Sequence, residues 1–131
     1  MPKPPIPADL VELLRKPNPA VMATVHPDGA PVSVATWYLW DEGRIVLNLD
    51  AGRKRLEHLR ADPRVSLTVL DNDSWNRHVS LQGAVTLTPD PDLADIDRLA
   101  RHYTGKPYRN RQRARVTAWL DVDRYHMWDA R

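Results

Sequence analysis

Three consecutive cations, Arg53, Lys54 and Arg55, follow Gly52 where a strand ends and a short helix is expected. The first amides of a helix lack hydrogen-bond partners and its dipole is positive there, so cations at this place are unfavourable alone. A phosphate would reverse this repulsion, because Arg53 and Lys54 would become its ligands and Gly52 would let the backbone approach. Local physics favours this interpretation over three cations that only solvate a helix end. Arg55 is expected to be a solvated neighbour.

Other reactive groups are scarce in this sequence. The absence of cysteine excludes disulfides, zinc–thiolate sites and thiol nucleophiles. The histidines show neither metal-ligand spacing nor a Ser–His–acid set, so no metal site and no catalytic residue are predicted. The five histidines are His26, His58, His78, His102 and His126.

The 131 residues carry a formal net charge of only +2, but the basic residues cluster. Residues 51–64 hold five of the 19 lysines and arginines, and residues 101–115 hold six more with no acid between them. Such patches indicate either an anionic partner or solvated helix faces, and the charge pattern leaves both open. The start of the chain lacks a signal-peptide pattern and no stretch reaches membrane-spanning length. A cytoplasmic protein without a membrane partner is therefore expected.

The hydrophobic pattern predicts one domain over residues 8–131, preceded by a flexible proline-rich tail over residues 1–7. Helices are expected over 8–16, at the cationic segment, and over 88–105, where Asp90 is the expected N-cap and Gly105 the stop. The predicted strands are 20–26, 30–39, 44–49, 64–70, 77–87, 114–122 and 124–128, and the letters DVD at residues 121–123 mark the break between the last two.

The predicted strand over 30–39 carries apolar side chains on both of its faces. This pattern predicts a central strand. The aromatic residues Trp37, Tyr38 and Trp40 are expected in barrel packing and a dimer contact, and Trp119 in the core or an interface. The predicted fold is mainly β with helices (α+β), with six to seven mostly antiparallel strands in a small barrel.

The run GRIVLNLDAGRKRLEHLRADPRVSLTVLDNDSWNRHVSLQGAV, residues 43–85, resembles the pyridoxamine-phosphate-oxidase-like split β-barrel flavoproteins. In that family a strand, a turn ending in Arg-Lys, a helix, a PRVSL strand and a strand closing on glycine occur in this order. The resemblance extends over residues 8–128. It implies an antiparallel split β-barrel of the FMN-binding type that forms a homodimer, with the cofactor at the subunit interface.

The resemblance also implies roles for individual residues. Arg53 and Lys54 would hold the flavin 5′-phosphate beside Gly52, and Leu47 and Asn48 would lie along the cofactor. His78 matches the position of a polar residue directed at the ring. The isoalloxazine ring would pack on Val32, Ser33, Val34, Ala35, Thr36 and Trp37.

Trp75 is placed in a polar loop, where its exposure needs an explanation. Two interpretations remain open: it lines the pocket from the partner subunit, or it is a packing residue.

The chain lacks the C-terminal arginine motif of the vitamin-processing oxidases, and it looks more like the branch that uses the deazaflavin coenzyme F420. Lys106, Arg109 and Arg111 would then meet the acidic tail of F420 or an acidic substrate. The implied function is an F420-dependent oxidoreductase that transfers a hydride between the deazaflavin and a small conjugated organic substrate.

Three alternatives remain at this stage. The first is an FMN-dependent oxidoreductase of the same family, because the phosphate site is common to both cofactors. The second is a flavin or F420 carrier without turnover. The third is a nucleic-acid-binding barrel, against which stand the few exposed basic–aromatic pairs and a helix start that suits a single phosphate.

Overall fold

The computed structural model describes residues 1–131, in which seven strands and three helices follow one another along the chain. The elements are α1 (Ala8–Leu14), β1 (Ala20–Val25), β2 (Pro31–Thr36), β3 (Leu39–Asp41), β4 (Arg44–Asp50), α2 (Lys54–Ala61), β5 (Arg64–Leu70), β6 (Arg77–Pro89), α3 (Ala94–Thr104) and β7 (Arg115–Asp129). All strand pairs are antiparallel, in the order β2-β1-β5-β6-β7-β4-β3. The predicted strand number and antiparallel arrangement are confirmed.

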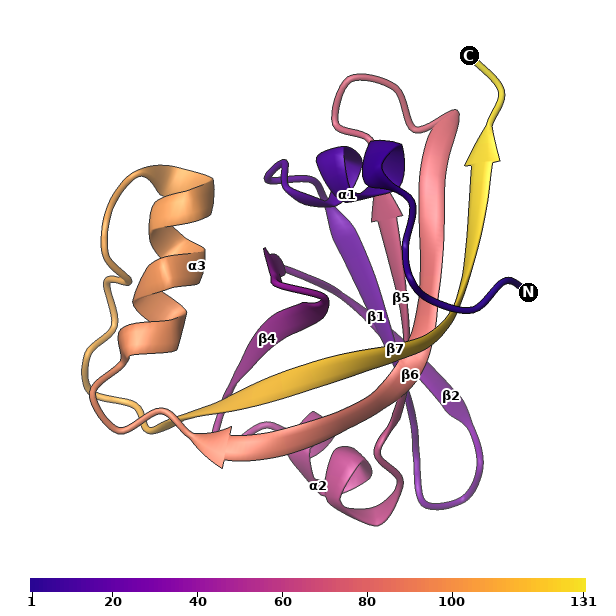
Figure 1. Ribbon diagram of the computed structural model, residues 1–131. Helices are drawn as coiled ribbons and strands as arrows, with labels where there is room; N and C mark the ends of the chain where they lie inside the picture. Colours follow the sequence, from indigo (N-terminus) through magenta and orange to yellow (C-terminus); the bar gives the residue numbers. More distant parts are fainter.

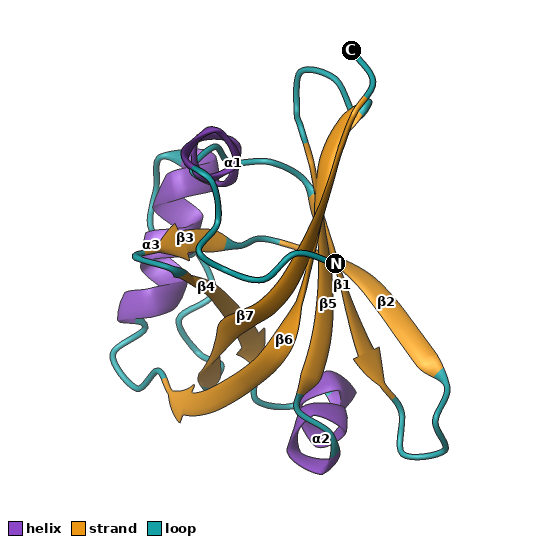
Figure 2. Cartoon of the chain, turned by 45° about the vertical axis from the view of Figure 1, so that its right-hand side comes forward, coloured by secondary structure: helices purple, strands orange, loops and turns teal.

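The sheet is strongly curved, and the long strands β6 and β7 run side by side through it (Figure 1). Its concave side encloses a core of 19 buried residues, to which α1 contributes Leu10, Leu13 and Leu14 and α2 contributes Leu56 and Leu59. Helix α3 lies outside this core, beside β4 (Figure 2). There a second, smaller cluster joins the helix to the strand.

Strand β4 is covered on both faces, which explains its nearly continuous apolar sequence. Ile45, Leu47 and Leu49 belong to the barrel core. Val46 faces the opposite way and packs with Ile96 and Leu99 of α3. Residues of β4 therefore alternate between the core and the layer that contains α3.

The prediction of a central strand over 30–39 is wrong. Strand β2 ends at Thr36, lies at the edge of the sheet and is largely exposed. Apolar side chains on both faces indicate that both faces of a strand are covered, but they do not indicate which element covers them. The chain then turns at Trp37 and Tyr38. Tyr38 is fully buried, and its hydroxyl is satisfied there because it donates to the Lys16 carbonyl and accepts from Asn18.

The start of the third helix also differs from the prediction. The N-cap is Leu93, with a positive φ of 60°, and not Asp90. Asp90 still caps the helix from a distance, because its carboxylate accepts hydrogen bonds from the amides of Asp95 and Ile96 at 3.1 and 3.0 Å. Gly105 ends the helix as predicted, with a φ of 78°.

The predicted break between the last two strands is a β-bulge within the single strand β7. Gln82 pairs with Arg124 and Gly83 pairs with Val122, so Asp123 has no partner on β6. Residues 1–7 form no helix or strand, although the Pro2 carbonyl accepts a hydrogen bond from the Tyr125 amide. None of the three helices is long and apolar enough to cross a membrane.

The bulge makes a prediction for Gly83. A Cβ at this position would overlap the carbonyl oxygen of Asp121, which the β6–β7 ladder holds in place. We expect Gly83→Ala to lower the free energy of unfolding by about 3 kcal/mol, measured by urea denaturation. Gly105→Ala is the control, because its Cβ would meet no atom within 4 Å and only its positive φ costs about 1 kcal/mol. Equal losses in the two variants would contradict the steric explanation.

Candidate functional site

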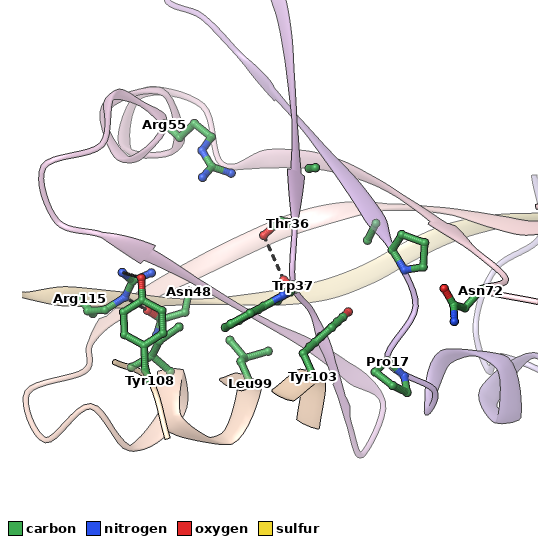
Figure 3. A pocket seen from close by; sticks show the side chains of 14 residues that line it. Pro17, Thr36, Trp37, Asn48, Arg55, Asn72, Leu99, Tyr103, Tyr108 and Arg115 are labelled. Carbon is green, nitrogen blue, oxygen red and sulfur yellow. Dashed lines mark hydrogen bonds between the residues drawn. The ribbon is translucent and has the colours of Figure 1, made fainter. Parts of the chain in front are cut away.

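The main cavity lies between α3, strand β4, the end of β2 and the segment before β1, and its volume is about 610 Å³ (Figure 3). This size is typical of small-molecule sites. The residues that line it are Pro17, Pro19, Ala20, Ala35, Thr36, Trp37, Asn48, Arg55, Asn72, Ile96, Leu99, Tyr103, Tyr108 and Arg115.

The middle of the cavity is aromatic. Trp37 stacks on Tyr103 of α3, with ring centroids 5.3 Å apart and planes 13° from parallel, and Tyr108 meets Trp37 edge-on at 6.3 Å. The Tyr103 hydroxyl donates to the Asn18 carbonyl and accepts from the Tyr38 amide. Burial raises the pKa of Tyr103 to about 12, so its hydroxyl stays protonated and holds the ring in place. The aromatic surface is therefore rigid and suits a flat ligand.

Two guanidinium groups lie at one end of the same cavity (Figure 3). Arg55 extends from α2, and its nearest polar partner is the sulfur of Met22 at 3.9 Å. Burial lowers the pKa of Arg55, and the charges of Arg53 and Arg115 lower it further. Arg115, at the start of β7, donates from Nε to Asn48 Oδ1 at 2.8 Å and lies 4.8 Å from the centre of the Tyr108 ring. Neither arginine has a carboxylate within ion-pair distance.

The structure brings four of the thirteen predicted site residues to the cavity: Ala35, Thr36, Trp37 and Asn48. Leu47, the neighbour of Asn48 in β4, is fully buried in the barrel core, because adjacent residues of a strand point to opposite faces.

The remaining predicted residues of β2, Val32, Ser33 and Val34, do not line the cavity. Their assignment to the cofactor stays a prediction.

The turn before α2 differs from the expected phosphate cradle. The Gly52 amide donates to the carboxylate of Asp50 at 2.8 Å, and the same carboxylate pairs with Arg113 at 3.0 Å. Arg53 and Lys54 are exposed and do not line the cavity. Their role as phosphate ligands stays a prediction.

Trp75 and His78 also lie outside the cavity lining. Trp75 is 68% exposed in the loop between β5 and β6. His78 is the second residue of β6 and pairs with Trp128 of β7, and its Nδ1 lies 2.9 Å from the Trp75 carbonyl oxygen. A contribution of these residues to a site on another subunit stays a prediction.

Sequence reasoning missed the two cavity arginines and both tyrosines. Arg55 was expected to be solvated, yet it is half-buried and faces the cavity. The spacing in the helix indicates this orientation, because Arg55 and the buried Leu59 are four residues apart and share a helix face. Arg115 likewise shares a strand face with the buried Thr117.

The basic stretch 101–115 is partly neutralised within the chain. Asp97 of α3 accepts two hydrogen bonds from the Arg111 guanidinium, at 2.9 and 3.1 Å, and one from the Tyr108 amide at 3.0 Å. These bonds fix the loop that presents Tyr108 to the cavity. Lys106 and Arg109 are exposed and form no ion pair.

The family model described as pyridoxamine 5′-phosphate oxidase matches residues 6–129. The chain belongs to this family. The match covers nearly the whole chain, and it confirms the resemblance to the pyridoxamine 5′-phosphate oxidase-like family found in residues 43–85.

Solved structures support the same fold. A protein named F420 reductase is 27% identical, with a TM-score of 0.85 over 92% of this chain and 98% of that one. A conserved hypothetical protein from Mycobacterium tuberculosis is also 27% identical, with a TM-score of 0.79 over 98% of this chain and 88% of that one. General Stress Protein 26 from Bacillus anthracis, 13% identical with a TM-score of 0.69 over 90% of this chain and 89% of that one, shares the fold.

The Asp97 contacts predict a pH-dependent contribution to stability. Hydrogen bonds from Arg111 hold the pKa of Asp97 below its usual value of 3.8. Their stabilisation is therefore complete above that value and is lost as the pH falls through the lowered pKa. We expect Asp97→Asn to reduce the free energy of unfolding by about 1 kcal/mol at neutral pH. In urea denaturation the difference from the wild type should shrink below about pH 4, and a constant difference would refute this assignment.

Proposed function

We propose that this protein is an F420-dependent oxidoreductase that transfers a hydride between the deazaflavin and a small conjugated organic substrate. The observation that carries the proposal is the combination, in one cavity, of a rigid aromatic surface at Trp37 and two guanidiniums without carboxylate partners, Arg55 and Arg115. A planar ring system that bears an anionic group matches both features.

The residues present fit such a cofactor. Ala35, Thr36 and Trp37 offer the end of β2 to a ring, and Arg55 offers a charge to a phosphate at the start of α2. Arg53 and Lys54 would meet the same phosphate from the solvent side, as the family resemblance implies. The bound cofactor would supply the hydride chemistry, while the chain binds it and orients one face toward the substrate.

Two observations favour F420 over FMN. The 27% identical structure that is matched over 98% of its length is an F420 reductase. Lys106 and Arg109 also form no ion pair. They lie in the loop that presents Tyr108 to the cavity, where they could bind the acidic tail of F420. FMN remains the alternative cofactor, because its phosphate would meet the same arginines.

A homodimer with the cofactor at its interface is part of this proposal. Strand β2 ends the sheet with an unpaired, largely exposed edge, and its Val34 is exposed in the single chain. Proteins seldom leave an apolar edge strand uncovered. A second copy would cover this edge next to the cavity residues Ala35 and Thr36.

Cofactor preference is testable by titrating the purified protein with oxidised F420 and with FMN while following tryptophan fluorescence. Because Trp37 lines the cavity, a bound ring should quench its emission. We expect F420 to bind more tightly than FMN. Tight FMN binding without F420 binding would overturn the choice of cofactor. Oxidation of reduced F420 by a panel of conjugated enones then separates an enzyme from a carrier, which would bind F420 without turnover.

The phosphate assignment predicts the effect of Lys54→Ala. Loss of a charge-assisted hydrogen bond should weaken cofactor binding by roughly 1–3 kcal/mol, with little change in folding stability because Lys54 is exposed. Arg60→Gln, an exposed cation of the same helix outside the cavity, is the matched control. Unchanged affinity in Lys54→Ala would remove this residue from the site.

A further inference from the structure

Arg115 is held by a chain of buried polar side chains that leads away from the cavity. Its Nε donates to Asn48 Oδ1, and Asn48 Nδ2 donates to Asp90 Oδ2 at 3.1 Å and to Thr117 Oγ1 at 3.2 Å. The Thr117 hydroxyl donates its own proton to Asp95 at 2.7 Å, so it can only accept from Asn48. This fixes the orientation of the Asn48 amide and turns its oxygen toward Arg115.

The side-chain partner of Arg115 is an amide and not a carboxylate. Arg55 likewise has only the neutral Met22 sulfur as its side-chain partner. The arginines that pair with an aspartate are Arg64, Arg77, Arg98, Arg111, Arg113 and Arg131. The Asp90 carboxylate lies one hydrogen bond further on, with the Asn48 amide in between. Asp50 is also nearby, but it is paired with Arg113. An amide orients a guanidinium without neutralising it, so the charge of Arg115 stays available.

The remaining contacts of Arg115 direct it at the cavity. The Tyr108 ring covers one face of the guanidinium, and Nη1 donates to the Tyr108 hydroxyl at 3.3 Å. Arg55 lies at the same end of the cavity as Arg115, and the two positive charges repel each other. An anion at this end would relieve that repulsion.

We propose that Arg115 is an oxyanion-binding residue, and that Asn48 and Asp90 are positioning residues that aim it without cancelling its charge. The ligand class is a phosphate or carboxylate carried by a flat ring system that lies on Trp37. This proposal rests on the proposed function for the nature of the ring, but not for the oxyanion. The oxyanion belongs either to the cofactor or to an acidic substrate, and the two sources are separable.

The first experiment compares Arg115→Gln with Arg101→Gln, an exposed arginine of α3 that has no ion pair and does not line the cavity. Affinities are measured for FMN and riboflavin, and for F420 and its chromophore without phosphate and tail. If the cofactor supplies the oxyanion, Arg115→Gln should weaken binding of the phosphate-bearing member of each pair by roughly ten- to a hundredfold and leave the phosphate-free member unchanged. Arg101→Gln should change neither.

If the substrate supplies the oxyanion, cofactor affinities stay unchanged in Arg115→Gln. The KM of an enone that carries a carboxylate then rises roughly ten- to a hundredfold, while the KM of its ester does not. Either result supports the oxyanion role. An Arg115→Gln variant that matches Arg101→Gln in all these measurements overturns it.

The positioning roles need a separate readout, because loss of a buried amide also affects stability. In Asn48→Asp a carboxylate replaces the amide with the same shape, so it should neutralise Arg115. It should then reduce the same preference that Arg115→Gln reduces, either for the phosphate-bearing cofactor or for the carboxylate-bearing enone, and by as much. Asn48→Ala is used if the new carboxylate beside Asp90 prevents folding, and its effect should not add to that of Arg115→Gln. Additive losses, or an unchanged preference in the folded variant, would reduce Asn48 to a packing residue.

Failure of the proposed function would leave this inference testable. If the wild-type protein binds neither cofactor, thermal denaturation in inorganic phosphate decides the matter. A rise in Tm with phosphate that disappears in Arg115→Gln but persists in Arg101→Gln supports the oxyanion site. An equal rise in all three proteins shows that phosphate binds elsewhere and overturns it.

Discussion

The site depends on one strand that is buried on both sides. Strand β4 has the barrel core on one face and helix α3 on the other, so successive residues enter different layers. Ile45, Leu47 and Leu49 hold the strand in the barrel, and this fixes Val46 and Asn48 on the side of α3. The packing of α3 on β4 therefore brings together five of the fourteen residues that line the cavity: Asn48, Ile96, Leu99, Tyr103 and Tyr108.

Much of the fold follows from the sequence because its signals are local. Runs such as residues 64–70 alternate with period two and end at turn residues, and the stripe of Ile96, Leu99 and Tyr103 has helical spacing. Sheet order is different, because it is decided by which strands meet and not by the residues of one strand. The edge position of β2 is an example. The apolar residues on its two faces could be recognised in the sequence, but the elements that lie next to them could not.

The candidate site was predictable in its chemistry and only partly in its residues. A cluster of cations and a ring that packs on the strand ending at Trp37 were both expected, and Trp37 and Asn48 line the cavity. The cation that faces the cavity from α2 is Arg55, because the helix phase set by Leu56 and Leu59 turns Arg53 and Lys54 outward. The hydrogen bond between Arg115 and Asn48 could not be predicted, because the two residues lie 67 positions apart in the sequence and meet only through the pairing of β4 with β7.

The bulge at Asp123 has a consequence for how strand β7 reads as a sequence. Before it, even-numbered residues such as Ala118, Leu120 and Val122 pack on the barrel core, whereas after it the odd-numbered Tyr125 and Met127 do so. One unpaired residue therefore shifts the phase of the alternation by one position within an uninterrupted ladder. Polar substitutions in β7 should therefore be tolerated at odd-numbered positions before Asp123 and at even-numbered positions after it.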